Sequence, residues 1–403
     1  MSNEADPLEK IADEAIREQV REVFSKAENG TPDNISKAGC LALAKKGKDV
    51  WNAWREAFPA WGEFFKWGNE VDFSAHDFRN DTIDFSGFAF GRNTNFRGAL
   101  FDHHVDFKDA QFDGTADFQG TKFGKHTDFH GARFDGTADF QGAKFCNSAV
   151  FRDARFGNKA NFQGVQFHLS ADFKDAQFGN KANFTEVRFE RFVDFNDSCF
   201  KGATTFARAS FATAPTFHGC EFHQDTSFEG TEFPKASGDE AAARAYRTLK
   251  LAFSKQQAVR EEQCFFRLEM AEETQRETGL KRWLFRAYAF FSDYGFSVVR
   301  PLQYGGLAML ALTMIYGLWS GLGQCVLGAG TCDFAPQWLE FSLIQALPLP
   351  GLEKLSEAAS KTFWPDGPWW ALLLSVLVIT HKVISLAFLF LAGLALRNLF
   401  KMK

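Results

Sequence analysis

Phenylalanine recurs at a fixed interval along the middle of this 403-residue chain. From Phe90 to Phe233, 27 phenylalanines follow one another at alternating steps of six and five residues. An amphipathic helix repeats every ~3.6 residues and a half-buried strand about every two, so neither explains the interval. Fixed self-similarity indicates a repeat architecture, in which each short unit buries its apolar side chain against its neighbours.

A second position moves with the first. A small residue usually stands two positions before each phenylalanine, as Ala138 does before Phe140. Residues i and i−2 of an extended segment point to the same side, so each short strand directs one large ring and one small side chain inward. Asp or Asn precedes alternate rings, and these residue types suit the corners of a tightly wound coil.

The pattern Ala-Asp/Asn-Phe-x-x resembles the pentapeptide-repeat family, in the branch whose units form an eleven-residue pair; residues 138–148, for example, read ADFQGAKFCNS. The resemblance covers about 160 residues and implies a right-handed, quadrilateral β-helix with one short face per pentapeptide. The six-residue step implies an extra residue at every second corner and about 22 residues per coil. Adjacent coils should then stack ~4.8 Å apart, in roughly seven coils.

The inward rings of the central coils are the predicted structural core of the repeat. They are Phe107, Phe112, Phe118, Phe123, Phe129, Phe134, Phe140, Phe145, Phe151, Phe156, Phe162 and Phe167. Helical patterns flank the repeat on both sides, and we expect Trp51 to help plug its open end, because repeat arrays need a cap. The predicted domains are a helical N-terminal cap at 1–70, the β-helix at 71–233, a helical linker and C-terminal cap at 234–300, and a membrane domain at 301–403.

Two apolar stretches in the last hundred residues, 302–322 and 369–396, are long enough to cross a ~30 Å hydrocarbon layer. Basic residues precede the first stretch and follow the second, whereas the segment between them, 323–368, holds five acidic residues and two lysines. The positive-inside rule therefore predicts two spans, with both termini and the β-helix in the cytoplasm. We expect a multi-pass protein of the bacterial cytoplasmic (inner) membrane.

Between the two stretches, residues 337–351 are apolar and helical for about ten residues and are then broken by prolines and glycine. This segment is too short to span and predicts an interfacial or re-entrant half-helix. Its candidate residues are Gln345, Pro348, Pro350 and Gly351. A half-helix between two spans is also the topology of two-span cation channels, but the sequence here does not resemble a potassium filter.

His381 and Lys382 fall near the middle of the second stretch. A charge there costs at least ~2.5–3.5 kcal/mol, so such residues usually face protein or a water-filled cavity. Lys382 has no acidic partner in either stretch. Three explanations stay open: a tilted or broken span, a neutral lysine, or an oligomer that encloses the side chain, and the last leads us to expect a homo-oligomer.

The net charge is −5, and the repeat carries 23 acidic against 17 basic residues. Interspersed lysines and arginines dilute any stripe that could imitate DNA, which carries one charge per ~1.7 Å, so both a nucleic-acid partner and a DNA-mimic inhibitor of topoisomerases are disfavoured. Seven cysteines occur without a C-x-x-C pair. Cys325 and Cys332 would face an oxidising compartment, and we predict a disulfide between them.

The sequence contains no nucleotide-binding glycine loop, nucleophile elbow or His-Glu-x-x-His motif, and we expect neither catalysis nor a cofactor or metal site. We expect a membrane-anchored scaffold whose cytosolic β-helix binds a protein partner or another copy of itself. The alternative is an oligomeric two-span pore or ion-channel-like effector with the β-helix as its sensor. The lipid bilayer is a partner in both hypotheses.

Overall fold

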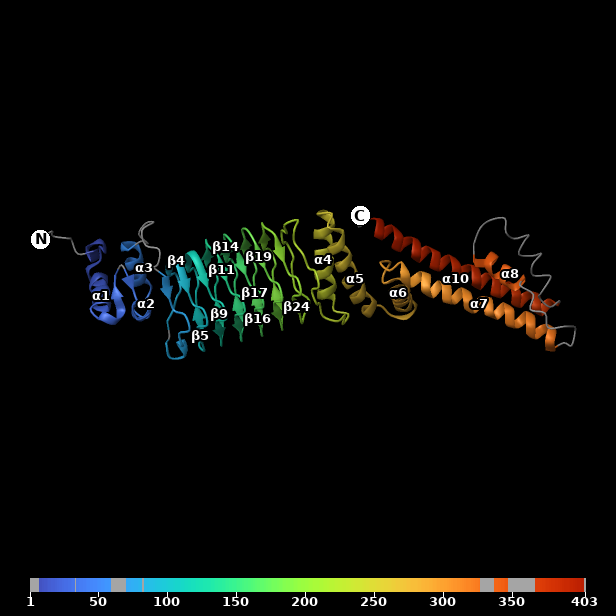
Figure 1. Ribbon diagram of the computed structural model, residues 1–403, viewed down its shortest axis with the longest axis horizontal. Coiled ribbons are helices and arrows are strands. Elements are labelled where there is room, and N and C mark those ends of the chain that lie inside the picture. The colour runs from blue at the N-terminus through green and yellow to red at the C-terminus, as the bar shows by residue number, and fades with distance from the viewer. Residues whose placement is uncertain are drawn as a thin grey trace. The chain divides into compact units, whose positions relative to one another are not determined.

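The computed structural model describes residues 7–32, 34–58, 70–81, 83–326, 337–346 and 367–401. It divides into two compact units, Met1–Glu272 and Glu273–Lys403. The first unit holds N-terminal helices, a β-solenoid and helices that follow it (Figure 1). The second unit is helical in its described residues. Cys332, the side chain of Cys325, and Pro348, Pro350 and Gly351 lie outside the described residues, so the predicted disulfide and most of the broken half-helix stay predictions.

The N-terminal cap holds three α-helices and a small antiparallel ladder. Asp13 accepts hydrogen bonds from the backbone of Ala15 and Ile16, and Ser36 accepts one from Gly39; both side chains satisfy first-turn N–H groups of the helices they precede. The elements are η1 (Pro7–Lys10), α1 (Glu14–Phe24), η2 (Ala27–Asn29), β1 (Gly30–Thr31), β2 (Asn34–Ile35), α2 (Lys37–Ala44) and α3 (Lys48–Ala57).

Trp51 of α3 closes the N-terminal end of the solenoid, as the sequence predicts. Its side chain is fully buried, with ring centroids 5.4 Å from Phe88 and 5.7 Å from Phe90. Its indole nitrogen donates to the carbonyl of Ala89 at 2.9 Å. Trp51 therefore covers the first rings of the solenoid with apolar surface and donates a hydrogen bond to a backbone carbonyl at its N-terminal end.

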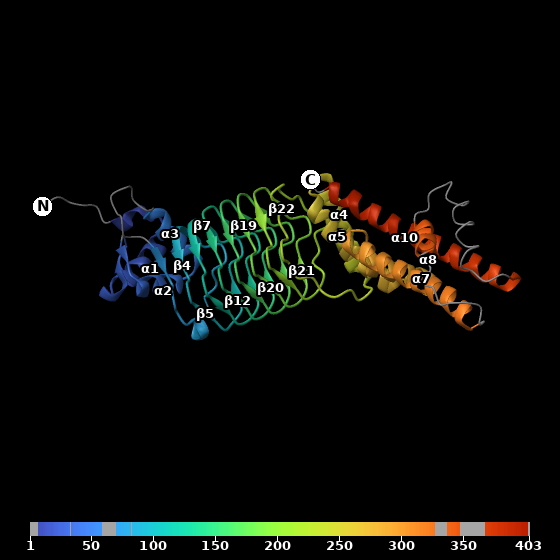
Figure 2. The same cartoon turned by 45° about the vertical axis from the view of Figure 1, so that its right-hand side comes forward.

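The solenoid begins with β3 (Glu70–Asp72), η3 (Phe78–Asn80) and β4 (Ala89–Asn95) and continues as parallel ladders (Figure 2). One sheet has the long strand β7 (Gln111–Asp117) at its centre. On one side of β7 follow β10 (Arg133–Phe134), β14 (Arg155–Phe156), β18 (Gln177–Phe178) and β22 (Cys199–Phe200). On the other side follow β11 (Ala138–Asp139), β15 (Ala160–Asn161), β19 (Ala182–Asn183) and β23 (Thr204–Thr205). Because β7 turns a corner, this sheet contributes two ladders.

Two further sheets complete each coil. One holds β5 (Leu100–Phe101), β8 (Lys122–Phe123), β12 (Lys144–Phe145), β16 (Gln166–Phe167), β20 (Arg188–Phe189) and β24 (Ser210–Phe211). The other holds β6 (Val105–Asp106), β9 (Thr127–Asp128), β13 (Ala149–Val150), β17 (Ala171–Asp172) and β21 (Val193–Asp194). The chain thus makes four ladder strands per coil.

Paired residues in the regular ladders are 22 apart, as Phe112 and Phe134 are, which confirms the predicted coil length. Rings stack from coil to coil: the centroids of Phe107 and Phe129 lie 4.8 Å apart with an interplanar angle of 2°. Within a coil the rings meet edge to face, as Phe107 and Phe118 do at 85°. All twelve predicted core phenylalanines are at most 1% exposed.

Two kinds of corner alternate along the coils. Each five-residue step contains a tight turn that is closed by a backbone hydrogen bond, for example from the Ala110 N–H to the Phe107 carbonyl. The third residue of this turn has positive φ. Gly120 takes this position at φ 65° and Asp109 at φ 54°. Glycine is favoured there because it has no Cβ, and Asp tolerates the left-handed region. The six-residue steps carry the extra residue.

Regular pairing covers about six turns and ends at β24. Isolated bridges continue the ladders, and rings stack as far as Phe233. Pro215 is buried in this last coil. In earlier coils the equivalent residue, such as Ala171, donates its N–H to the next coil, so a proline without that donor is tolerated only where no coil follows.

The helices α4 (Glu240–Lys255) and α5 (Val259–Arg276) follow the last coil. The ring centroids of Phe253 and Phe265 lie 5.8 Å and 5.1 Å from Phe228, and both contacts are edge to face. These two side chains cover the last rings, as Trp51 covers the first.

The second unit contains α6 (Gly279–Ser292), α7 (Val299–Val326), α8 (Gln337–Ala346) and α10 (Pro368–Lys401). The helices α7 and α10 pack side by side, and α8 packs against both (Figure 1). Gly305 lets α7 approach Phe388 of α10, since a Cβ at this glycine would lie 3.1 Å from the Phe388 side chain. Asn398, near the end of α10, donates to the Gly295 carbonyl at 2.8 Å.

Among the described residues, α10 is the one helix long and apolar enough to cross a membrane, by length and composition. It covers the predicted stretch 369–396. The helix α7 covers the predicted stretch 302–322 but is less apolar, with Gln303, Tyr304 and five glycines among its residues. The two-span topology therefore stays a prediction.

Replacing Phe140 with Asp should destroy the middle of the solenoid, because an unpaired carboxylate would lie inside a dry column of rings. We expect a loss of more than about 4 kcal/mol in the free energy of unfolding. The measurement is thermal unfolding of the detergent-solubilised full chain by circular dichroism. Gln141→Asp, which places the same carboxylate on the exposed neighbour, should unfold like the parent; equal behaviour of the two variants would contradict the ring-stack core.

Candidate functional site

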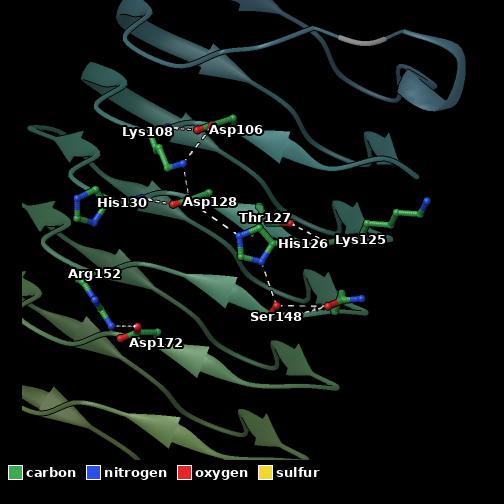
Figure 3. Close-up of polar contacts among 11 residues, drawn as sticks. Asp106, Lys108, Lys125, His126, Thr127, Asp128, His130, Ser148, Arg152 and Asp172 are labelled. Carbon is green, nitrogen blue, oxygen red and sulfur yellow. Dashed lines mark hydrogen bonds and ion pairs between the residues drawn. The ribbon is translucent and has the colours of Figure 1, made fainter.

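The outer surface of the solenoid carries columns of polar side chains that recur coil after coil. On the sheet of β6, β9 and β13, Asp128 is only 7% exposed. One of its oxygens accepts the His130 backbone N–H at 2.8 Å, and the other lies 3.2 Å from the Lys108 ammonium (Figure 3). Lys108 also lies 3.5 Å from Asp106, and its hydrogen bond to Asp128 raises the pKa of Lys108.

His126 joins three coils on this surface. Its Nδ1 lies 3.0 Å from the Ser148 hydroxyl, and its Nε2 lies 3.9 Å from Asp128 (Figure 3). The imidazole also stacks on His104 of the preceding coil, with 5.1 Å between ring centroids. The contacts run along the solenoid axis, so each coil holds the next through its outer side chains as well as through its rings.

Charges on this sheet pair between coils rather than gathering in one stripe. Arg152 donates to Asp172 of the next coil at 2.8 Å (Figure 3). The neighbouring ladder carries an amide column, in which Asn161 donates to Asp139 at 2.9 Å and accepts from Asn183 at 3.0 Å. Both arrangements give flat, ordered faces with repeating donors and acceptors, which suit recognition of a surface more than chemistry on a small molecule.

Burial changes the pKa of one carboxyl group in the amide column. It raises the pKa of Asp117, which is half-buried, and the charge of Asp139 on the next coil adds to the effect. Within the residues that the structure describes, no three His, Cys, Asp or Glu side chains lie close enough together to hold a metal ion.

A second group of polar and sulfur-containing side chains lies between the helices of the helical unit, where Ser342, His381 and Ser385 are buried and Met309 and Thr313 are half-buried. The buried polar cluster consists of Met309 and Thr313 from α7, Ser342 from α8, and His381 and Ser385 from α10. His381 Nε2 lies 3.0 Å from the Met309 sulfur, and the Ser385 hydroxyl donates to the same sulfur at 3.3 Å. The Thr313 and Ser342 hydroxyls lie 2.6 Å apart and join α7 to α8.

Aromatic side chains close the buried polar cluster. Tyr316 stacks on His381 with 5.9 Å between ring centroids and meets Phe341 of α8 edge to face at 5.2 Å. His381 is fully buried, and its Nδ1 finds no hydrogen-bond partner among the described residues. Gln345 is also fully buried, one turn along α8 from Phe341.

The structure separates the two predicted intramembrane residues. His381 belongs to the buried polar cluster, whereas Lys382 is half-buried beside it and makes no ion pair or side-chain hydrogen bond with the described part of the chain. Successive helical residues point ~100° apart, so both cannot face α7. The predicted roles of His381 and Lys382 must therefore be considered separately.

A scan against protein-family models matches the family described as pentapeptide repeats (9 copies), at residues 85–133, 118–166 and 162–210. Residues 85–210 of this chain are therefore pentapeptide repeats. The match coincides with the coils whose residues pair 22 apart. No curated protein and no solved structure was found to match the pentapeptide-repeat protein.

Sequence reasoning found His381 but missed its partners in this pentapeptide-repeat protein. Met309, Thr313 and Ser385 are polar or sulfur-containing residues within apolar runs, and Ser385 follows His381 by four residues, on the same helical face. That spacing was a usable signal for α10. Nothing in the sequence, however, specifies which turn of α7 or of α8 would lie opposite His381.

Thr313→Val should loosen α8 from α7, because valine keeps the shape but removes the hydroxyl that contacts Ser342. Such interhelical bonds contribute about 0.6–1.7 kcal/mol, so amide exchange of α8 should speed up about 3- to 20-fold. The measurement is hydrogen–deuterium exchange with mass spectrometry on the detergent-solubilised protein.

Thr380→Val is the matched control for this change. Thr380, like Thr313, bonds the carbonyl four residues earlier, but its side chain is exposed on α10 and does not reach α8. We expect parental exchange of α8 in this variant. Identical exchange of α8 in both variants would show that the Thr313–Ser342 contact does not hold the helix.

Proposed function

We propose that this pentapeptide-repeat protein is a non-enzymatic, membrane-anchored scaffold. Its β-solenoid presents flat faces to a cytosolic protein partner or to another copy of the chain, and α7 and α10 anchor it as a two-span hairpin. The four ladders correspond to the four sides of a right-handed, quadrilateral coil. The ordered columns of paired charges and amides on these sides support the role in protein recognition.

The membrane anchor is supported by the distribution of side chains in the helical unit, where apolar side chains lie on the outside and polar side chains lie between the helices. Only 11% of the most apolar stretch of α10 is buried. The buried positions at the centre of the unit hold His381 and Ser385, which are 0% and 3% exposed. The large exposed apolar side chains of the pair include Leu302, Leu307, Leu310, Met314 and Leu318 in α7, and Leu372, Val376, Ile379, Val383, Leu386, Leu389 and Phe390 in α10.

Such a surface is unfavourable in water, because a monomeric soluble protein rarely exposes an apolar patch of this extent. It is favourable in lipid, where apolar side chains meet acyl chains and polar groups face other helices. The Asn398–Gly295 hydrogen bond joins the end of α10 to the segment before α7. Arg300 and Arg397 thus belong to one end of the hairpin, which supports a cytoplasmic location of both termini under the positive-inside rule.

An oligomeric pore is the second candidate, and Lys382 favours it. This half-buried lysine has no ion-pair partner among the described residues, and α8 contacts α7 at Thr313, near the middle of that helix. An ammonium at membrane depth usually faces protein or water. A second copy of the chain would either cover Lys382 with protein or enclose water beside it. Both candidates therefore predict a homo-oligomer.

Extraction of membranes with alkaline carbonate, followed by mass measurement of the detergent-solubilised particle, tests the proposal. We expect the protein to stay in the membrane pellet. The protein mass of the solubilised particle should be two or more times the 45.3 kDa of one chain. Release into the carbonate supernatant would contradict the anchor, and a monomer would contradict the oligomer.

Planar-bilayer recording of the same particle separates the two candidates. The scaffold predicts no conductance from a confirmed oligomer. Single-channel steps that are absent in Lys382→Leu would favour the pore instead. Thr380→Leu, on the exposed side of α10, is the control for a change of bulk in that helix.

A further inference from the structure

The helix α6 has an apolar face that is largely exposed among the described residues. Leu280 is 72% exposed, Trp283 63%, Leu284 50% and Phe290 56%. At ~100° per residue these four side chains lie within an arc of about 120°, and Ala287 fills the same arc. No charged residue interrupts the arc, so this apolar face of α6 is continuous over the length of the helix.

The opposite side of α6 is occupied. Tyr288 meets Tyr294 edge to face, with 5.8 Å between ring centroids, and Ser292 is fully buried with its hydroxyl on the Tyr288 carbonyl. Lys281 pairs with Glu277 and lies over the Phe285 ring. The helix therefore has one packed side and one largely exposed apolar side, on which Leu280, Trp283 and Leu284 are at least half exposed and Phe290 contacts Tyr304 of α7.

The apolar face of α6 continues onto the outer surface of the proposed hairpin. The Phe290 ring lies 4.8 Å from Tyr304 of α7, and the Phe291 ring lies 5.3 Å from Phe388 of α10. Leu302 of α7 and Phe390 of α10 are exposed near these contacts. Whatever solvent surrounds α7 and α10 thus also reaches α6.

Basic residues flank the apolar face. Arg286 is exposed and follows Phe290 on the helical wheel. Arg282 comes next on the wheel, is half-buried and donates a hydrogen bond to Gln275 of α5 at 3.0 Å, and α6 contains no acidic residue. Arg300 and Arg397 belong to the same end of the hairpin. An amphipathic helix with a tryptophan on its apolar face and arginines at its polar boundary has the composition of helices that lie in a membrane interface.

We propose that α6 lies in the headgroup layer of an anionic phospholipid surface. Leu280, Trp283, Leu284 and Phe290 contact the upper acyl chains, while Arg282 and Arg286 bind headgroup phosphates. The proposal rests on the membrane anchoring proposed above, since the hairpin brings α6 to the bilayer. Arginines near an anionic leaflet add to the binding that the apolar area provides, and this favours lipid over an apolar protein groove.

Tryptophan fluorescence in lipid nanodiscs tests the proposal. The full chain and Trp283→Phe are reconstituted in phosphatidylcholine mixed with phosphatidylglycerol, with or without bromine on acyl carbons near the headgroup. Their difference spectrum isolates Trp283. We expect a blue-shifted emission that the brominated lipid quenches. The matched control is the difference for Trp54→Phe, a buried tryptophan of the N-terminal cap, which the brominated lipid should leave unchanged.

The double variant Arg282→Gln/Arg286→Gln tests the choice of headgroup. Removing the two charges should lower the ratio of inserted to free α6 by roughly fivefold per arginine in the anionic discs, and much less in pure phosphatidylcholine. Arg133→Gln/Arg155→Gln removes the same charge from the exposed solenoid surface and should leave the Trp283 signal unchanged.

Three results would overturn the inference. An unquenched, red-shifted Trp283 would place α6 in water. A blue-shifted Trp283 that brominated lipid does not quench would indicate a protein interface, such as a second copy. Equal quenching with and without phosphatidylglycerol would exclude anionic recognition. Carbonate extraction of the same preparations keeps the two proposals apart, because release of the whole chain contradicts the anchor, whereas retention with unquenched Trp283 contradicts only the role of α6.

Discussion

The fold of this pentapeptide-repeat protein depends on the stacking of phenylalanine rings from coil to coil. Each ring lies about one strand spacing from the equivalent ring of the next coil, as Phe118 and Phe140 do at 4.8 Å between centroids. Within a coil the rings meet edge to face, a geometry that aromatic quadrupoles favour. Because each column requires one ring per coil, the spacing of phenylalanine sets the length of the coil and the positions of its corners.

The solenoid was predictable because its constraint is local and repeated. The alternation of five and six residues specifies a coil of 22 residues, and the ladders pair at that separation. The corners were only partly predictable. Glycines such as Gly120 mark the positive-φ positions, but Glu186 and Arg208 take the same conformation, at φ 60° and 55°. The register imposed by the neighbouring coils overrides the preference of these two residues.

The buried polar cluster was not predictable in the same way. Its residues come from three helices that no repeat brings into register, and the contact of His381 with Met309 depends on how α7 and α10 pack side by side. A polar residue within an apolar run indicates a site but does not identify its partners. For the same reason Lys382, adjacent in sequence, does not share the surroundings of His381.

The two units differ in whether their polar side chains repeat along the chain. The solenoid repeats polar side chains at equivalent positions of many coils, as Asp106, Asp128 and Asp172 show, and the proposed partner surface rests on this repetition. The helical unit holds a few polar side chains that occur only once, and many large apolar side chains of α7 and α10 are exposed on its surface. Caps such as Trp51 and Phe253 close the ring columns, so the apolar core is not exposed at either end of the solenoid.

Cysteine cross-linking across neighbouring coils would measure the length of the coil in solution. Gln119 and Gln141 are 22 residues apart, and the Gly120 N–H bonds the Gln141 carbonyl on the next coil. Cysteines at both positions would have Cα atoms about 4.8 Å apart, within the range that a disulfide bridges. We expect Gln119→Cys/Gln141→Cys to close a disulfide under mild oxidation, and Gln119→Cys/His130→Cys, only 11 residues apart but on a different side of the coil, to stay reduced. Equal cross-linking of the two pairs, or none at 119 and 141, would contradict a coil of this length.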